Sequence, residues 1–97
     1  MGVLVVIQGD LRQGADEALN SYRAVARAVI QKHGGQTLGA GGGVKAFGEG
    51  KVSQVGFILR FVDLAAVEGW LNDPDYQKVL PLRQKAYARL EINVYQE

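Results

Sequence analysis

Few side chains of this chain could take part in acid–base chemistry. His33 is the only histidine among the 97 residues, and imidazole is the side chain that gains and loses a proton near neutral pH. Tyr76 and Arg83 lie on either side of Pro81, where a phenol and a guanidinium could orient an anionic oxygen. These residue types predict a small organic ligand that could carry a carboxylate. If there is catalysis, we expect proton transfer or isomerisation with His33 as acid or base.

Each of these residues also has a structural interpretation. His33 falls on the apolar stripe of a helix at its last turn, and the position favours a capping or partly buried structural histidine. Arg83 could pair with Asp75 or Glu91, or cap its own helix. Tyr76 could be a core residue whose hydroxyl reaches the surface.

Trp70 and Arg60 complete the predicted ligand-binding residues. Trp70 is first of all a core anchor. Arg60 is the one charged residue in an apolar strand. Inside a barrel it would need a bound anion or a partner, because a lone buried charge costs several kcal/mol or more. At a seam between two subunits it could pair with an acid of the other chain, and the sequence leaves both positions open.

Composition excludes several classes of function. The chain has no cysteine, one histidine and scattered carboxylates, so we expect no disulfide, no metal site and no cofactor. A net charge of +1 gives no reason to expect nucleic acid or a membrane surface as partner. The apolar run Val3–Ile7 is too short for a membrane span or a signal peptide, so we expect a cytoplasmic protein.

Two segments are similar to phosphate-binding motifs but depart from them. The glycine-rich stretch 39–43 precedes strand-like residues rather than a helix, which indicates a bulged or bent strand instead of a phosphate loop. The segment 6–12 resembles the phosphate-binding loop of acylphosphatases, which makes that hydrolase activity a remote alternative. Arg12, however, comes one residue early for that pattern.

The elements that must position these residues follow from hydrophobic spacing. The sequence predicts a strand at 3–7, a helix from Asp16 that ends at Gly34-Gly35, and strands near 37–47 and at 55–61 around a turn at 48–51. A short helix capped by Asp63 comes next, then a helix that begins at Pro74 and is kinked or split by Pro81, and a last strand near 90–94.

This order, βαββαβ, predicts a single domain over residues 1–97. Its fold class is α+β, a ferredoxin-like sandwich of an antiparallel sheet with helices on one face. The strand at 55–61 is apolar on both sides apart from Gly56 and Arg60, so the second face of the sheet is also expected to be covered. A second copy of the chain, packed sheet to sheet, is the expected cover, which makes a homodimer.

Several segments together resemble a known family. They are His33-Gly34-Gly35, Gly41-Gly42, Glu49-Gly50, and the run 64–83 with Trp70, Asp73-Pro74-Asp75-Tyr76 and Pro81-Leu82-Arg83. In this order they resemble the domain-of-unknown-function family 1330, within the dimeric α/β-barrel superfamily. The resemblance implies a homodimer whose sheets enclose a barrel-like interior. Relatives in the superfamily include cofactor-free monooxygenases and isomerases, and the family itself has no settled activity.

The chain departs from the family at three positions. Ala40 stands where the family usually has an arginine before its Gly-Gly pair, Arg60 replaces a common acid, and Val62 replaces a proline. One cation is lost and another gained, which predicts a pocket with altered charge. A non-enzymatic binding or interaction module, its barrel filled by core side chains, is the alternative to an enzyme, and the shortage of acid and base residues favours it.

Overall fold

The computed structural model describes residues 2–97, which form one sheet and a layer of helices. In chain order the elements are β1 (Val3–Leu11), α1 (Asp16–Lys32), β2 (Gln36–Gly42), β3 (Val55–Phe61), α2 (Leu64–Asn72), α3 (Pro74–Lys78), α4 (Leu80–Ala86) and β4 (Tyr87–Gln96).

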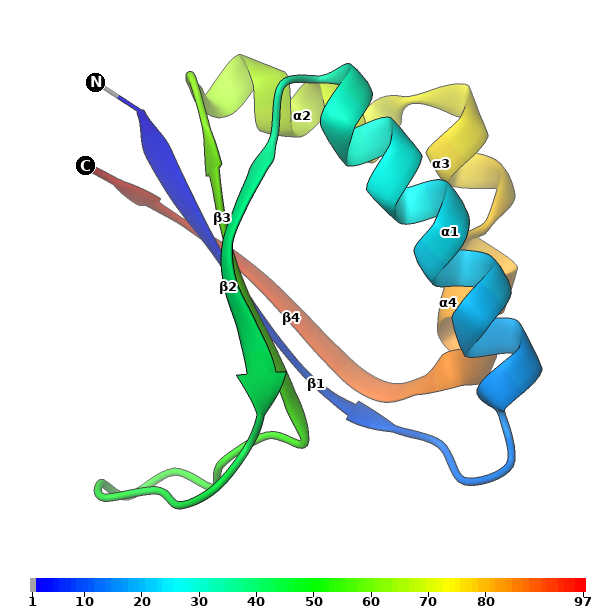
Figure 1. Ribbon diagram of the computed structural model, residues 1–97, viewed down its shortest axis with the longest axis vertical. Helices are drawn as coiled ribbons and strands as arrows, with labels where there is room; N and C mark the ends of the chain where they lie inside the picture. Colours follow the sequence, from blue (N-terminus) through cyan, green and yellow to red (C-terminus); the bar gives the residue numbers. More distant parts are fainter. Residues whose placement is uncertain (1) are drawn as a thin grey trace.

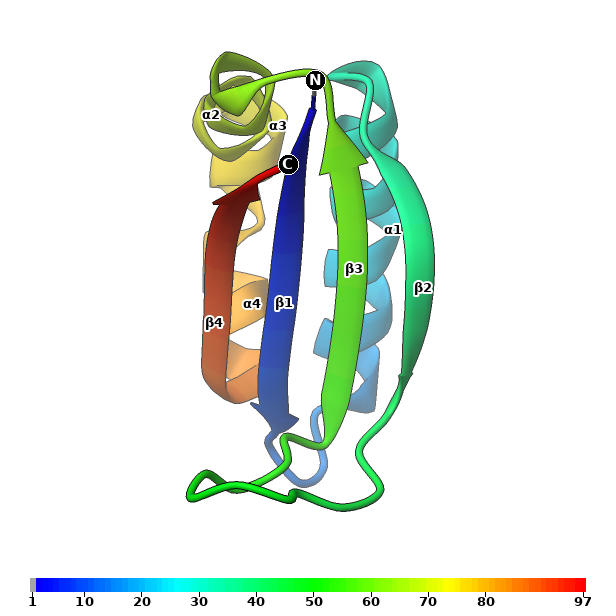
Figure 2. The same ribbon diagram turned by 90° about the vertical axis from the view of Figure 1, so that its left-hand side faces the viewer.

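The sheet has the strand order β2-β3-β1-β4, and every neighbouring pair is antiparallel. All the helices lie on one side of it (Figure 1), and the view from the other side shows the strands with nothing in front of them (Figure 2). The predicted ferredoxin-like α+β fold is confirmed.

The pleat of the strands divides the apolar residues between the two faces. Val3, Val5 and Ile7 of β1 are buried under the helices, together with Leu59 and Phe61 of β3. Their neighbours in the chain point the opposite way, because side chains alternate along a strand. The face that points away from the helices is called the open face here.

The helix α1 ends through its glycines, as the sequence predicts. Gly34 adopts a φ of 81°, a left-handed conformation that favours glycine. The Gly34 N–H donates to the Gln31 carbonyl at 3.0 Å, and the Gly35 N–H donates to the Ile30 carbonyl at 2.9 Å. These two bonds form the Schellman motif, which turns the chain sharply into β2.

The segment after β3 forms three short helices because polar caps and prolines divide it. The Asp63 carboxylate accepts from the Ala66 N–H at 2.9 Å and caps α2. Asp73 does the same for α3 through the Asp75 N–H, with Pro74 in the first turn. Pro81 cannot donate a backbone hydrogen bond, and the helix is split there into α3 and α4, as predicted.

The connection between β2 and β3 is longer than the sequence predicts. Val44 and Phe47, expected in the second strand, lie beyond its end at Gly42 and are 93% and 90% exposed. The predicted turn at 48–51 is therefore the middle of a loop, residues 43–54, that projects from the sheet (Figure 1). The apolar side chains gave a strand pattern, but the surrounding glycines leave them no sheet surface to pack on.

The predicted irregularity in the glycine-rich strand is present. The register between β2 and β3 shifts between Thr37 and Gly39, so that Leu38 has no partner in the ladder. This bulge bends β2 at its start. β1 and β4 are also longer than predicted, since they pair from Val3 with Gln96 to Leu11 with Tyr87. None of the helices within residues 2–97 has the length and apolar character that crossing a bilayer requires.

Candidate functional site

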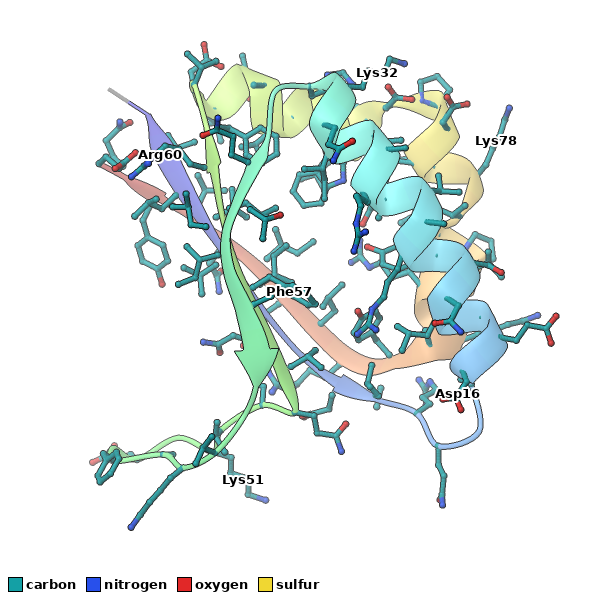
Figure 3. The ribbon with its side chains drawn as sticks, in the orientation of Figure 1. Asp16, Lys32, Lys51, Phe57, Arg60 and Lys78 are labelled. Atoms are coloured by element: carbon teal, nitrogen blue, oxygen red, sulfur yellow. The ribbon has the colours of Figure 1, made fainter. Side chains whose placement is uncertain are left out.

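A cavity of about 890 Å³ lies between α1 and the inner face of the sheet. One wall is the helix, from Tyr22 to Gln31, and the other is formed by apolar side chains of the strands. Phe57 belongs to that second wall, and Figure 3 shows it on β3 in the space that faces α1. The apolar lining residues from the sheet are Ile7, Val55, Phe57, Leu59, Leu90 and Ile92. The volume is in the range of small-molecule sites.

Two buried hydrogen-bond donors, on residues that line the cavity, have no partner among the residues that the structure describes. Arg23 Nε is buried and makes no hydrogen bond, and the same holds for Trp70 Nε1. Both residues line the cavity. A buried donor without a partner costs free energy, about 1–3 kcal/mol and more when it is charged. Both nitrogens carry only donors, so each would be satisfied by an acceptor atom.

The charge of the cavity is all positive. Arg27 lies one helical turn after Arg23 on α1 and also lines the cavity, with its side chain exposed at the surface. Among the lining residues that the structure describes, no aspartate or glutamate accompanies the two arginines. A molecule with an anionic group and an apolar body would complement this surface, and a cation would not.

Tyr22, on the helical wall, begins a chain of hydrogen bonds that leads out of the cavity. Its hydroxyl lies 2.7 Å from the Tyr76 hydroxyl, and both side chains are buried. Arg83 Nη1 donates to the Tyr76 oxygen at 3.1 Å. Burial, and then the neighbouring Tyr76, raise the pKa of Tyr22 above its usual value. Tyr22 is therefore a neutral donor or acceptor at physiological pH.

The predicted acid or base, His33, lies in a different environment. Its Nε2 is 2.8 Å from the Asp73 carboxylate, which also accepts from Lys32 Nζ at 2.9 Å and from the Asp75 N–H at 2.9 Å. The hydrogen bond from Lys32 and then that to His33 hold the pKa of Asp73 well below its usual range. His33 joins the end of α1 to the start of α3, as in the structural interpretation. It does not line the cavity.

The other predicted site residues are divided between the two faces of the sheet. Trp70 lines the cavity and stacks on Phe61, with ring centroids 5.7 Å apart. Tyr76 and Arg83 lie behind Tyr22 and reach the cavity only through it. Arg60 stands on the open face, away from the cavity (Figure 3), where its guanidinium holds Glu97 through two bonds of 2.8 Å. The roles of these residues in ligand binding stay predictions.

Further positions singled out in the sequence also have clear places. Ala40 lines the cavity, so the arginine that the family usually has there would stand in it. Arg12 donates from Nε to the Gln84 carbonyl at 3.1 Å and ties the start of α1 to α4. Of the proposed partners of Arg83, Glu91 pairs instead with Arg89 and Asp75 with Lys78.

Sequence reasoning missed Arg23 and Arg27 as cavity residues. Their spacing of four places both on one face of α1, beside its apolar stripe. The aliphatic part of an arginine beside an apolar stripe can lie along that stripe and bring the guanidinium inward. The position of the two arginines beside the stripe could therefore have identified them as cavity residues. Within residues 2–97, no three His, Cys, Asp or Glu side chains gather as a metal would require.

Comparison with known proteins now gives this geometry a context. The family model described as "Domain of unknown function (DUF1330)" matches residues 5–94. No curated protein matches the chain.

Among solved structures, a protein of unknown function from Rhodopseudomonas palustris is similar, with a TM-score of 0.86 at 18% identity, over 99% of this chain and 82% of that one. A dimeric protein of unknown function with a ferredoxin-like fold, from Bacteroides fragilis, gives a TM-score of 0.65 at 14% identity, over 99% and 96% of the two chains. SnoaB, a cofactor-independent oxygenase from Streptomyces nogalater, gives 0.68 at 16% identity, over 99% and 92%.

At such identities these likenesses show a shared fold and no shared activity. The match of the family model covers nearly the whole sequence and agrees with the resemblance drawn from the motifs. The chain belongs to the DUF1330 family of domains of unknown function and has a ferredoxin-like fold.

Proposed function

We propose that this protein binds a small organic molecule, with an apolar body and a carboxylate or similar anionic group, in the cavity between α1 and the sheet. The observation that carries the proposal is that Arg23 lines the cavity and has a buried Nε without a hydrogen-bond partner within residues 2–97, while the other charged lining residue, Arg27, is also positive. An anionic oxygen at Arg23 would satisfy that donor, and the apolar strand residues would cover the rest of the molecule.

The proposal concerns binding, which an enzyme and a binding module would share. The cavity leaves space between α1 and the sheet that core side chains do not fill. Proton transfer or isomerisation by His33 stays a prediction, since His33 is held by Asp73 and does not line the cavity.

The test uses 2-naphthoate, a fluorescent planar carboxylate, with 2-naphthylmethylammonium as its cationic counterpart. We expect naphthoate to bind and the ammonium compound to bind at least tenfold more weakly. Arg23→Gln should weaken naphthoate binding by about tenfold to a hundredfold, because a hydrogen bond to a charged group contributes roughly 1.5–3 kcal/mol. Fluorescence titration measures both affinities.

The matched control is Lys78→Gln, which removes a cation from α3 where the side chain points into solvent (Figure 3). Its naphthoate affinity should equal that of the wild type. An unchanged affinity in Arg23→Gln, or no binding of naphthoate at millimolar concentration, would overturn the proposal.

We propose also that a second copy of the chain covers the open face. Leu4 and Val6 of β1 are half-buried there, and Ile58 and Tyr95 are 43% and 56% exposed, which is a large apolar surface for the face of a sheet. The loop 43–54 projects away from the helices (Figure 1), toward the side on which that copy would lie. The similar protein from Bacteroides fragilis is described as dimeric, which supports self-association.

A further inference from the structure

The hydroxyl groups of Tyr22 and Tyr76 have more protons than the neighbouring acceptors can use. Arg83 has only donors, so the Tyr76 oxygen accepts from it. The two phenols then share one bond, at 2.7 Å, in which either can donate. Whichever donates, the other phenol keeps a proton for which the described residues offer no acceptor.

The position of the cavity decides where that spare proton can be used. Tyr22 lines the cavity, whereas Tyr76 does not. If Tyr76 donates to Tyr22, the spare proton belongs to the phenol that lines the cavity. In the opposite arrangement the spare proton stays on Tyr76, buried and without an acceptor, which costs free energy. An acceptor oxygen in the cavity thus selects the first arrangement.

We infer that Tyr22 is a hydrogen-bond donor to an anionic or partly anionic oxygen of the ligand, strengthened by Arg83 through Tyr76. This inference rests on the proposed function, because it needs a ligand in the cavity. The ligand class it adds is a molecule whose oxygen gains negative charge, such as an enol, a phenol or a conjugated carbonyl compound, beside the anionic group held at Arg23.

The hydrogen bonds from Arg83 through Tyr76 to Tyr22 favour donation from Tyr22 to the ligand. A cationic guanidinium polarises the Tyr76 O–H, and a polarised O–H is a stronger donor to the next oxygen along the chain. Both phenols are buried, where such polarisation is screened less than in water. The raised pKa of Tyr22 keeps its proton in place, so that Tyr22 stabilises charge on the ligand without giving up its proton.

The edge-to-face contacts of Tyr22 hold its ring for this role. Its centroid lies 6.0 Å from that of Tyr76 and 5.9 Å from that of Tyr87, with both neighbours inclined steeply to it. Tyr87 is the first residue of β4, so the Tyr22 ring is contacted from both the helical layer and the sheet. A donor with a fixed position loses little entropy when it bonds a ligand.

The experiment measures the ionisation of bound 2-naphthol, whose naphtholate absorbs at longer wavelength than the neutral form. In the wild type we expect the ionisation constant of the bound probe to be raised above that of free probe. Tyr22→Phe should lower that constant by about tenfold, the effect of one strong hydrogen bond. Arg83→Met should lower it by a smaller factor, and Arg83→Lys, which keeps a cationic donor, should retain most of the wild-type value.

The decisive comparison is a double-variant cycle. Because Arg83 acts through Tyr22, Arg83→Met should have no further effect on the probe in the Tyr22→Phe background. An Arg83 effect of equal size in both backgrounds would mean a direct charge effect and would overturn the relay. An ionisation constant in Tyr22→Phe equal to that of the wild type would do the same, and would leave Tyr22 a purely structural link between α1 and α3.

The two proposals fail in different ways. If 2-naphthoate does not bind, the ligand cavity itself is refuted. If naphthoate binds and depends on Arg23, but 2-naphthol does not bind or its ionisation ignores Tyr22, the relay alone is refuted. Tyr22→Phe keeps the ring that fills the core, and the folding of each variant is checked by thermal unfolding.

Discussion

At the scale of single residues, Asp73 has more roles than any other carboxylate that the structure describes. It caps α3, and it accepts from Lys32 and bonds His33 at the end of α1. Its carboxylate is almost completely buried, 3% exposed, beside two basic side chains. One side chain thus fixes the helix α1 relative to the segment that carries Tyr76.

The lowered pKa of Asp73 has a consequence for stability. A carboxyl group with a folded-state pKa below its unfolded value stabilises the fold at pH values above the unfolded pKa, near 3.9, and this contribution is lost as the pH falls toward the folded pKa. We expect Asp73→Asn to lower the melting temperature at pH 7. The difference from the wild type should shrink as the pH falls below about 4, because the carboxyl group is then protonated in the unfolded state and keeps its charge only in the folded state.

Thermal unfolding monitored by circular dichroism between pH 2 and pH 8 measures this difference. The control is Glu68→Gln, an exposed carboxylate on α2 that forms no ion pair within residues 2–97. It should leave the melting temperature unchanged. A constant gap between Asp73→Asn and the wild type over the whole pH range would show that only the cap matters.

The sequence identified side chains that form polar contacts, but it did not show which of them lie at the cavity. The sequence singled out His33, Tyr76 and Arg83, and all three are indeed bonded to other polar side chains. It did not reveal that Tyr22 stands between Tyr76 and the cavity, because residues 54 apart meet only in the folded chain. Long-range partners of this kind leave no mark in local spacing.

At the scale of elements, the end of α1 leaves the least room for a change of residue. Gly35 follows the left-handed Gly34, and a Cβ placed on Gly35 would lie 2.6 Å from Ile30 Cγ2 and 2.6 Å from Phe61 Cζ. The Phe61 ring is itself stacked on Trp70, so it cannot easily move away. The glycine pair therefore serves both the turn and the close approach of α1 to the sheet.

We expect Gly35→Ala to destabilise the protein by about 1–3 kcal/mol, the usual cost of overpacking a tight core. Urea denaturation measures the free energy of unfolding. Gly39→Ala, in β2, is the control because nothing lies within 4 Å of a Cβ built there, and it should change the free energy by less than about 0.5 kcal/mol. Equal losses in both variants would contradict the packing argument.

Elements with strong local signals were predictable, and those without them were not. The cap Asp63, the helix start at Pro74 and the break at Pro81 were identified correctly, because each acts on backbone groups within a few residues. The end of β2 was placed wrongly, since Val44 and Phe47 favour strands wherever they occur. Whether such residues pair depends on neighbours that the local sequence does not contain.

At the scale of the whole molecule, the sheet is covered on one side only. The order of elements determined the fold, and the alternation in β3 correctly divided its residues between the two faces. The size of the cavity could not be predicted, because it depends on how α1 rests on the sheet. Ala40 and Gly42, which line it, leave room that larger side chains would fill.

We expect the protein to sediment as a dimer at micromolar concentration. Ile58 lies in the middle of the open face, opposite Val6 in the neighbouring strand. Ile58→Glu should raise the dissociation constant of the dimer at least a hundredfold, since burial of an unpaired charge costs several kcal/mol. Analytical ultracentrifugation measures the constant. Val62→Glu, at an exposed position after β3, should have little effect, and a monomeric wild type would contradict the proposal.

The unequal exposure of the two cavity arginines gives the site a kinetic asymmetry. Arg27 is exposed, so its field extends into solvent and speeds the approach of anions, an effect that salt weakens over about 8 Å at physiological ionic strength. The buried Nε of Arg23 is screened far less. Rising salt should therefore slow capture of the ligand while its residence time changes little, so that one arginine governs arrival and the other departure.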